Sequence, residues 1–261
     1  MKKIPISHLP ATLPESLRRE LENAPLYDSS CSPEARVIYI EKNEGLYLKI
    51  AEQGTLSREA QMTAYFHGKG LGTEVLSYVS AEEDFLLTRA VRGEDLTHEG
   101  YLSNPERLCD TLAVTLRALH ETDFHGCPAE RRMTEYLALA DRNYKAGKFD
   151  ATLFPEGIGF ESAERAYAVL NDGRAAFKND TLLHGDYCLP NIIFGNWKLS
   201  AFIDLGNSGI GDRHVDLFWG AWTLFYNLKT DQYRDRFFDA YGRELVDDEL
   251  LKTVAAAEVF G

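Results

Sequence analysis

The sequence has few cysteines, and they follow no pattern that would give them a structural use. None of the four belongs to a CxxC pair or has a histidine at metal-ligand spacing; they are Cys31, Cys109, Cys127 and Cys188. Neither a zinc site nor a disulfide framework is indicated. We therefore expect reduced thiols in an intracellular protein.

Long hydrophobic runs are also missing. The longest uncharged stretch lies between Asp216 and Lys229, and it is well short of the ~20 apolar residues that span a bilayer. Near the N-terminus Pro5, His8 and Pro10 interrupt any apolar segment of the export type. We expect a cytoplasmic protein that does not bind membranes, and we interpret the uncharged stretch as a buried helix.

Positive charge is scarce. The 261 residues include 28 Lys and Arg against 41 Asp and Glu, which gives a net charge of −13. A field of this sign repels nucleic acid, so no nucleic-acid partner is expected. Residues 94–261 carry most of the excess, with 17 basic and 28 acidic side chains. Acidic surface often serves only solubility, but a cationic or metal-bridged partner fits this charge best.

The predicted elements change in kind near residue 93. Alternating residues on both sides of a turn at 43–45 predict a β-hairpin over 36–51. A helix over 56–69 and strands over 73–79 and 84–91 follow. Helical periodicity then dominates, in 105–120, 131–145, 162–177 and 215–228. We therefore predict an α+β fold with a small β lobe, residues 1–92, and a larger helical lobe, residues 93–261, with a ligand site at the cleft.

A short β segment inside the helical lobe places polar residues close together. If a four-residue turn pairs Phe194 with Leu199, Asn191 lies opposite Phe202. Asp204 is then a near-diagonal neighbour of Asn191, about 7–8 Å away or less. Asp and Asn oxygens suit Mg²⁺, so the spacing predicts that Asn191 and Asp204 bind this ion.

Asp186 precedes Asn191 by five residues, in a loop that contains glycine and proline. A carboxylate without a metal can orient an attacking hydroxyl, and phosphoryl transfer needs a metal, an oriented nucleophile and little else. We therefore predict Asp186 as the catalytic base; the alternative is that each acid caps a turn. His184 is expected to order the loop by hydrogen bonding, and Asp216 to be a buried structural carboxylate that caps the helix that follows it.

The β lobe should supply a cation for the nucleotide phosphates. Lys49 lies near the end of a predicted strand, and Glu59 borders the apolar stripe of the next helix. We predict that Glu59 pairs with Lys49. The alternative is that both side chains are simply solvated.

These residues together resemble the aminoglycoside phosphotransferases of the protein-kinase-like fold, most closely the group that modifies the 3′-hydroxyl. The segments HGDYCLPN at 184–191 and IDLGNSG at 203–209 are similar to the family's catalytic loop and to its counterpart of the kinase DFG segment. The segments LYLKI at 46–50 and REAQM at 58–62 resemble its lysine strand and paired-glutamate helix. The resemblance covers nearly the whole chain.

The resemblance implies a two-lobe, protein-kinase-like fold that uses ATP or GTP with Mg²⁺. It makes Lys49 the clamp on the α- and β-phosphates and Asp186 the base. It also places Ser32 in a short loop that faces the phosphates. Arg89 and Val91 would lie in the hinge, where backbone groups bind adenine.

The acceptor side departs from the family's pattern. Members usually carry acids in the helix after the DFG-like segment and an Asp-Glu pair before a terminal Phe, whereas residues 219–228 contain no acid and residues 257–260 read AEVF. The resemblance implies four acceptor-binding residues: Glu258, Phe260, Glu156 and Asp150. Asp231 is a further acid that this site can use.

The implied activity is transfer of the γ-phosphate to a hydroxyl of a cationic small molecule, namely the 3′-hydroxyl of an aminoglycoside, which confers antibiotic resistance. One alternative is a small-molecule kinase of the same fold with a choline, homoserine or fructosamine acceptor. Another is a catalytically silent nucleotide-binding module, against which the intact Asp186 argues. A monomer and a homodimer both remain open.

Overall fold

The computed structural model describes residues 3–154 and 159–261, and its contacts divide the chain into two compact units. The first contains the residues up to Tyr101 together with Leu189–Asn207, and the second contains Leu102–Cys188 and Ser208–Gly261. The predicted boundary at residues 92/93 therefore needs correction. The hairpin after the catalytic motif pairs with a strand that follows the β lobe, so it belongs to the first unit.

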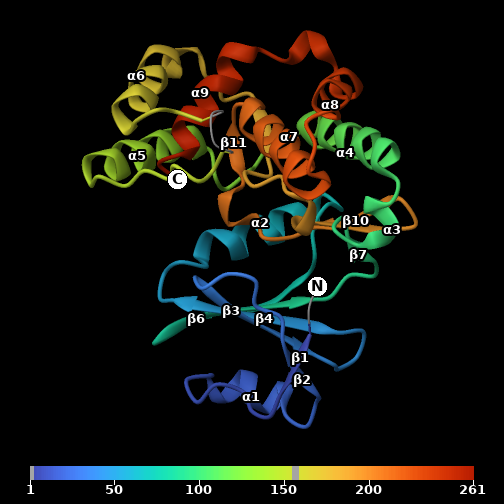
Figure 1. Cartoon of the computed structure of the whole chain (residues 1–261). Helices are drawn as coiled ribbons and strands as arrows, with labels where there is room; N and C mark the ends of the chain where they lie inside the picture. Colours follow the sequence, from blue (N-terminus) through green and yellow to red (C-terminus); the bar gives the residue numbers. More distant parts are fainter. Residues whose placement is uncertain (1–2, 155–158) are drawn as a thin grey trace. The chain divides into compact units, whose positions relative to one another are not determined.

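The first unit is built on a six-stranded antiparallel sheet in the order β1-β2-β3-β4-β6-β5 (Figure 1). Its elements are β1 (Ile4–Ile6), α1 (Glu15–Leu21), β2 (Leu26–Asp28), β3 (Ala35–Ile40), β4 (Leu46–Glu52), α2 (Ser57–Gly68), β5 (Val75–Ser80) and β6 (Glu83–Arg89). The predicted hairpin is confirmed, with Ile40 paired to Leu46 across its turn. The predicted helix and the two later strands also match within two residues.

Strand alternation decides what each face of this sheet carries. On β4, Leu48 and Ile50 are buried in the core that includes Leu17 and Leu21 of α1. Because successive side chains point to opposite faces, the intervening Lys49 emerges on the face covered by α2. Figure 1 shows α1 and α2 on opposite sides of the sheet.

A three-stranded sheet, in the order β10-β9-β7, joins the hairpin to the first unit. Its strands are β7 (Glu94–Asp95), β9 (Ile192–Gly195) and β10 (Lys198–Phe202). Leu199 pairs with Phe194 as predicted, but the register shifts between Leu199 and Ala201, so Phe202 pairs with Ile192. The predicted pairing of Asn191 with Phe202 is wrong by one residue, because the irregularity inserts an extra residue into β10.

The second unit is mostly helical. Its helices are α4 (Pro105–His120), α5 (Arg132–Lys145), α6 (Ala163–Gly173), α7 (His214–Leu228), α8 (Arg234–Tyr241) and α9 (Asp248–Glu258); α3 (Glu99–Leu102) spans the unit boundary. A two-stranded sheet pairs β8 (Thr181–Leu183) with β11 (Gly209–Gly211). Short 3₁₀ turns cover Arg174–Ala176, Leu189–Asn191, Leu205–Asn207 and Arg243–Leu245. The four predicted helices are confirmed, the third ending in a 3₁₀ turn.

A membrane-spanning helix is not found in the described part of the chain, where no helix is both long and apolar enough to cross a bilayer. The uncharged stretch between Asp216 and Lys229 forms most of α7. Much of that helix is buried, as the sequence predicted.

Candidate active site

A cavity of about 720 Å³ in the first unit gathers the residues predicted to bind nucleotide and metal. All seven line it: Ser32, Lys49, Glu59, Arg89, Val91, Asn191 and Asp204. Its size falls within the range of small-molecule sites. The seven residues come from the loop between β2 and β3, from β4, from α2, from the end of β6 and from the two ends of the β9-β10 hairpin, so folding brings together residues more than 150 positions apart.

Lys49 is the charged centre of this cavity. Its Nζ donates to Glu59 Oε2 at 2.7 Å and Oε1 at 2.9 Å, and to Asp204 Oδ1 at 2.7 Å. The Glu59 side chain is 9% exposed and that of Asp204 is 48% exposed. Glu59 therefore holds the ammonium from the buried side, whereas Asp204 reaches it from the open side. Burial lowers the pKa of Lys49, but the two carboxylates outweigh it and raise the pKa, so the cation is kept.

Asp204 and Asn191 lie near each other at the open end of the β9-β10 hairpin, away from its turn. The Ile203 amide donates to the Asn191 carbonyl at 3.0 Å. This main-chain hydrogen bond holds Asn191 beside the residue that precedes Asp204. Asp204 has φ 58°, a left-handed conformation that aspartate tolerates better than most residues. In the described ranges no group of three or more His, Cys, Asp or Glu side chains could hold a metal. An ion here would take its remaining ligands from a bound nucleotide and water.

The two predicted hinge residues differ in whether their backbone N–H and C=O groups are already hydrogen-bonded. The Arg89 amide donates to the Glu74 carbonyl at 2.9 Å, and the Arg89 carbonyl accepts from the Thr73 hydroxyl. Arg89 is therefore already engaged on both sides, and its side chain pairs with Glu74 at 2.7 Å. The backbone of Val91 has no hydrogen-bond partner among the described residues. Of the two predicted hinge residues, Val91 is the one that can bind an adenine edge.

Asp186 lies in the second unit, in a loop fixed by a buried carboxylate. The amides of His184 and Gly185 both donate to Asp216 at 2.7 Å, and the Asp186 amide donates to His184 Nδ1 at 3.3 Å. The expected ordering role of His184 is confirmed. Asp216 is a fully buried structural carboxylate, as expected, but the expected capping role is wrong, because Asp216 is the third residue of α7 and its oxygens hold the loop of the predicted base.

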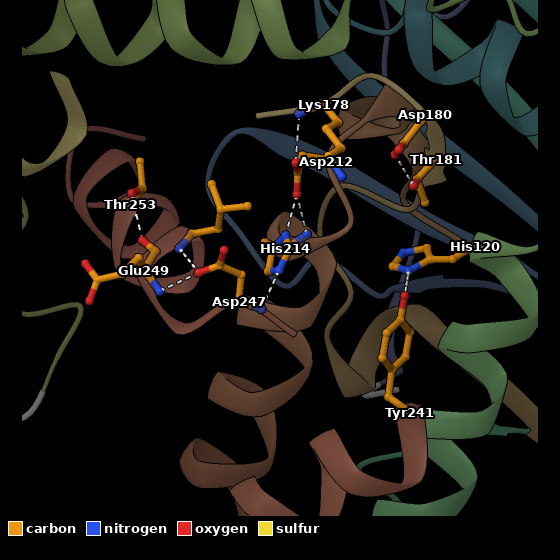
Figure 2. Close-up of polar contacts among 11 residues, drawn as sticks. His120, Lys178, Asp180, Thr181, Asp212, His214, Tyr241, Asp247, Glu249 and Thr253 are labelled. Carbon is orange, nitrogen blue, oxygen red and sulfur yellow. Dashed lines mark hydrogen bonds and ion pairs between the residues drawn. The ribbon is translucent and has the colours of Figure 1, made fainter. Parts of the chain in front are cut away.

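Two residues that the sequence analysis missed extend this support. His120 Nε2 lies 3.1 Å from Asp216 Oδ2. Figure 2 shows the other contact of this ring, in which Nδ1 lies 2.8 Å from the Tyr241 hydroxyl. Burial lowers the pKa of His120. The neutral ring donates from Nε2 and accepts from Tyr241. A signal was present, because His120 continues the apolar stripe of Leu112 and Leu116 along α4.

Glu258, the predicted acceptor-side acid, is half-buried at the end of α9. Its Oε1 accepts from the Tyr136 hydroxyl at 2.9 Å and from Trp219 Nε1 at 3.1 Å. Burial raises the pKa of Glu258 to about 7, against the lowering effect of these two donors, and the charge of Asp186 adds to the rise. Glu258 therefore lies within electrostatic reach of the predicted base.

The other three acceptor predictions fare differently. The ring of Phe260 is fully buried against Tyr144, Phe149 and Tyr167, so it belongs to the core rather than to an open surface. Asp150 accepts from the amide and hydroxyl of Thr152 and so closes a local turn. Glu156 lies outside the described residues.

The helices that carry Trp219 and Glu258 begin at one hydrogen-bonded chain (Figure 2). Asp212 accepts from the Lys178 amide at 2.8 Å and from His214 Nδ1 at 2.6 Å, at the start of α7. His214 Nε2 accepts from the Asp247 amide at 2.9 Å. Asp247 then caps α9 through the Glu249 amide at 2.9 Å. These bonds require a neutral His214 ring with its proton on Nδ1.

Comparisons with known proteins agree with this arrangement. The sequence profile of the phosphotransferase enzyme family matches residues 33–252. The chain is 51% identical over 249 residues to a probable aminoglycoside 3′-phosphotransferase of Lactococcus lactis subsp. lactis (strain IL1403), covering 95% of each chain. It is 29% identical over 211 residues to an aminoglycoside 3′-phosphotransferase of Niallia circulans, covering 79% of this chain and 80% of that one.

Two solved structures show the fold. An aminoglycoside-3′-phosphotransferase of type VIII matches with a TM-score of 0.80 at 24% identity, over 94% of this chain and 97% of that one. An aminoglycoside phosphotransferase of Streptomyces rimosus in complex with ADP and streptomycin matches with a TM-score of 0.76 at 22% identity, over 94% and 95%. The predicted α+β, protein-kinase-like fold is confirmed. The profile match and the 51% identical relative further show that the chain belongs to the phosphotransferase enzyme family, which includes the aminoglycoside 3′-phosphotransferases.

Proposed function

We propose that this protein transfers the γ-phosphoryl group of ATP or GTP to the 3′-hydroxyl of an aminoglycoside. The observation that carries the proposal is the cluster of Lys49, Glu59 and Asp204 in the large cavity of the first unit. A fixed cation between a buried and an exposed carboxylate suits a polyphosphate, because the ammonium stays charged and the outer carboxylate can turn to a metal ion. The 51% identical relative supports the choice of acceptor.

Asn191 and Asp204 would hold Mg²⁺, and their oxygens are of the kind this ion prefers. When bound, the ion neutralises charge on the β- and γ-phosphate oxygens. Lys49 binds the α- and β-phosphates and fixes their position, while Glu59 holds the lysine in place. Ser32 and the backbone of Val91 contact the phosphate and base ends of the same nucleotide.

Asp186 orients the acceptor hydroxyl and accepts its proton. The bond from the acceptor oxygen to the γ-phosphorus forms as the bond between that phosphorus and the bridging oxygen of the nucleoside diphosphate breaks. The nucleoside diphosphate leaves, and no phosphoenzyme is needed. The hydrogen bonds from His184 and Gly185 to Asp216 keep the loop rigid, so orienting the hydroxyl costs little at the moment of reaction.

The positive charge of the acceptor is complementary to the negative net charge of the chain. Aminoglycosides carry several ammonium groups, and the −13 net charge attracts them. Glu258 would take one ammonium near the reacting hydroxyl, and Asp231 is a second acid of the same unit. The added phosphate converts a polycation into a molecule with a local dianion, which disrupts its binding to RNA and gives resistance. We place the reaction in the cytoplasm, where the nucleotide donor is.

A coupled assay of nucleoside diphosphate release tests this function. Purified protein with MgATP, and separately with MgGTP, is presented with a panel of 4,6- and 4,5-disubstituted aminoglycosides, choline, homoserine and a fructosamine. We expect release only with aminoglycosides, and we expect omission of Mg²⁺ to abolish it. Release with a non-aminoglycoside acceptor alone, or no acceptor-dependent release at all, would contradict the proposal.

A further inference from the structure

Three aromatic side chains form a continuous ladder along one face of α7. Trp219, Trp222 and Tyr226 follow one another at i, i+3 and i+7. The Trp219 and Trp222 rings meet edge to face at 5.4 Å, and the Trp222 and Tyr226 rings stack at 4.9 Å with only 10° between their planes. The ladder spans about 10 Å of helix, at ~1.5 Å per residue.

The indoles are held so that their faces are fixed in orientation. Trp219 Nε1 donates to Glu258 and Trp222 Nε1 donates to the Leu153 carbonyl at 2.9 Å. With both N–H groups bonded, neither ring gains by turning. Tyr226 ends the ladder at the surface, where 53% of the residue is exposed. An exposed tyrosine supported from beneath by a stacked indole is a preorganised binding surface.

The outer ring of the ladder already takes a cation from this chain. Lys229 Nζ lies 4.2 Å from the centroid of the Tyr226 ring, within cation–π range. Lys229 ends α7 in a left-handed conformation at φ 58°. The position that its ammonium occupies is one that an ammonium group of a bound ligand can also occupy.

The inner end of the ladder reaches the predicted catalytic region. Trp219 bonds directly to Glu258, and the charge of Asp186 acts on that carboxylate. Thr223, on the same face of α7, interacts with Cys188, two residues after Asp186. The ladder therefore runs from the region of the base outward to solvent.

We propose that Trp219, Trp222 and Tyr226 form the surface that selects the acceptor, with a sugar ring stacking on the outer face of Tyr226, which Trp222 supports from beneath, while one ammonium pairs with Glu258. This inference rests on the proposed function and deepens it. Ring stacking responds to the shape and CH faces of a sugar, and it is screened by salt less than an ion pair. The site therefore distinguishes acceptors more by the ring that reaches the ladder than by their number of ammonium groups.

Substitutions at the exposed end test the proposal with little risk to folding. Tyr226→Leu keeps an apolar side chain but removes the ring, and we expect it to raise the acceptor KM about fivefold to tenfold while lowering kcat by less than twofold. Tyr226→Phe keeps the ring and should stay within about twofold of the parent in KM. Lys229→Gln removes the competing cation and should lower the acceptor KM. The KM for ATP serves as the internal control.

Tryptophan fluorescence gives a second readout that does not depend on turnover. The chain has three tryptophans, and Trp197 belongs to the first unit. An acceptor that stacks on the ladder should change the fluorescence of the parent and of Trp197→Phe, and the change should largely disappear in Trp222→Phe.

The outcomes separate this proposal from the function on which it rests. If the unsubstituted protein phosphorylates aminoglycosides but Tyr226→Leu leaves every acceptor KM within twofold and Trp222→Phe keeps the fluorescence change, the ladder is not the selecting surface and the function stands. If the unsubstituted protein shows no acceptor-dependent release, the function fails, and the ladder proposal fails with it.

Discussion

The two units hold charge in opposite ways. In the first, Lys49 is paired with Glu59 and Asp204, and part of the cluster is open to solvent. In the second, Glu258 is half-buried, accepts from the neutral donors Tyr136 and Trp219, and has a pKa raised to about 7 by burial. A fixed, always-charged cation suits a nucleotide, which is always a polyanion. A carboxylate near its titration point suits a ligand that brings its own cation.

The comparison also shows that the overall negative charge of the chain does not come from acids gathered at the proposed acceptor site. Residues 94–261 carry most of the acidic excess, yet residues 219–228 of α7, beginning with the Trp219 that contacts Glu258, offer aromatic rings and no acid. The acidic field attracts polycations in general. Selection among polycations then depends on the aromatic rings of α7 and on the carboxylate of Glu258.

Substituting the proposed base in the second unit should have the largest effect, and this effect should be on turnover. Asp186→Asn keeps the size and polarity of the side chain but cannot accept the hydroxyl proton, so we expect kcat to fall by about 10²-fold or more. Steady-state kinetics measures it, with the exposed Asp180→Asn as the matched control, which should stay near the parent. Turnover of Asp186→Asn within a few-fold of the parent would refute the assigned role.

Neutralising Glu258 should stabilise the fold at high pH and weaken the acceptor site. A carboxyl whose folded pKa is raised above its ordinary value of 4.5 favours its neutral form, so stability is lost as the pH rises from about 4.5 towards 7, and the loss is complete above that pKa. From a rise to about 7, Glu258→Gln should gain about 3 kcal/mol at pH 8, and the gain should shrink as the pH falls through 7 towards 5. Denaturant unfolding at pH 5–8 measures this.

The same variant should show a higher acceptor KM, because the amide cannot pair with an ammonium. If Glu258→Gln is less stable than the parent at pH 8, or has the same acceptor KM, the Glu258 carboxylate does not bind the acceptor in the way proposed.

Loss of the inner partner of Lys49 should affect the nucleotide alone. In Glu59→Gln the ammonium keeps only Asp204, which is then less available to a metal ion. We expect kcat/KM for ATP to fall about tenfold, equivalent to about 1.4 kcal/mol, with the acceptor KM unchanged. The exposed Glu52→Gln on β4 is the control. A comparable rise in acceptor KM would mean that the two sites are not separable in this way.

The smallest expected effect is at the cap of α9. Asp247→Ala removes the acceptor for the Glu249 and Leu250 amides, and loss of such a cap costs about 1 kcal/mol. We expect Tm to fall by about 2–4 °C and the acceptor KM to rise slightly, since Glu258 ends this helix. Asp247→Asn caps nearly as well and should behave like the parent. Equal losses in both variants would point to the charge rather than to the cap.

The sequence predicted best what local rules decide. Strand alternation placed Lys49, helix periodicity placed Glu59, and one short hairpin brought Asn191 near Asp204. The irregular register between Leu199 and Ala201 escaped prediction, because no residue there demands it. The division into units was also missed, since it depends on the pairing of β7 with β9.

Helix periodicity marks His120 as facing the core, but the distant partners that support the Asp186 loop and Glu258 could not be read from the sequence. Tyr136 and Trp219 meet Glu258 across 122 and 39 residues, and His120 meets Tyr241 across 121. Such contacts follow from how α4, α5, α7 and α9 pack, which periodicity alone does not specify. For the same reason the burial of Phe260, which the resemblance implied to be an acceptor-binding residue, could not be predicted.

The most direct test of the central claim uses a matched pair of acceptors, an aminoglycoside with a 3′-hydroxyl and its 3′-deoxy analogue, with initial rates of ADP release and the product mapped by phosphorus–proton NMR. The account predicts one ADP per acceptor, phosphate attached to the 3′-oxygen, and no release with the deoxy analogue. Equal rates with both acceptors, or phosphate on another oxygen, would contradict it.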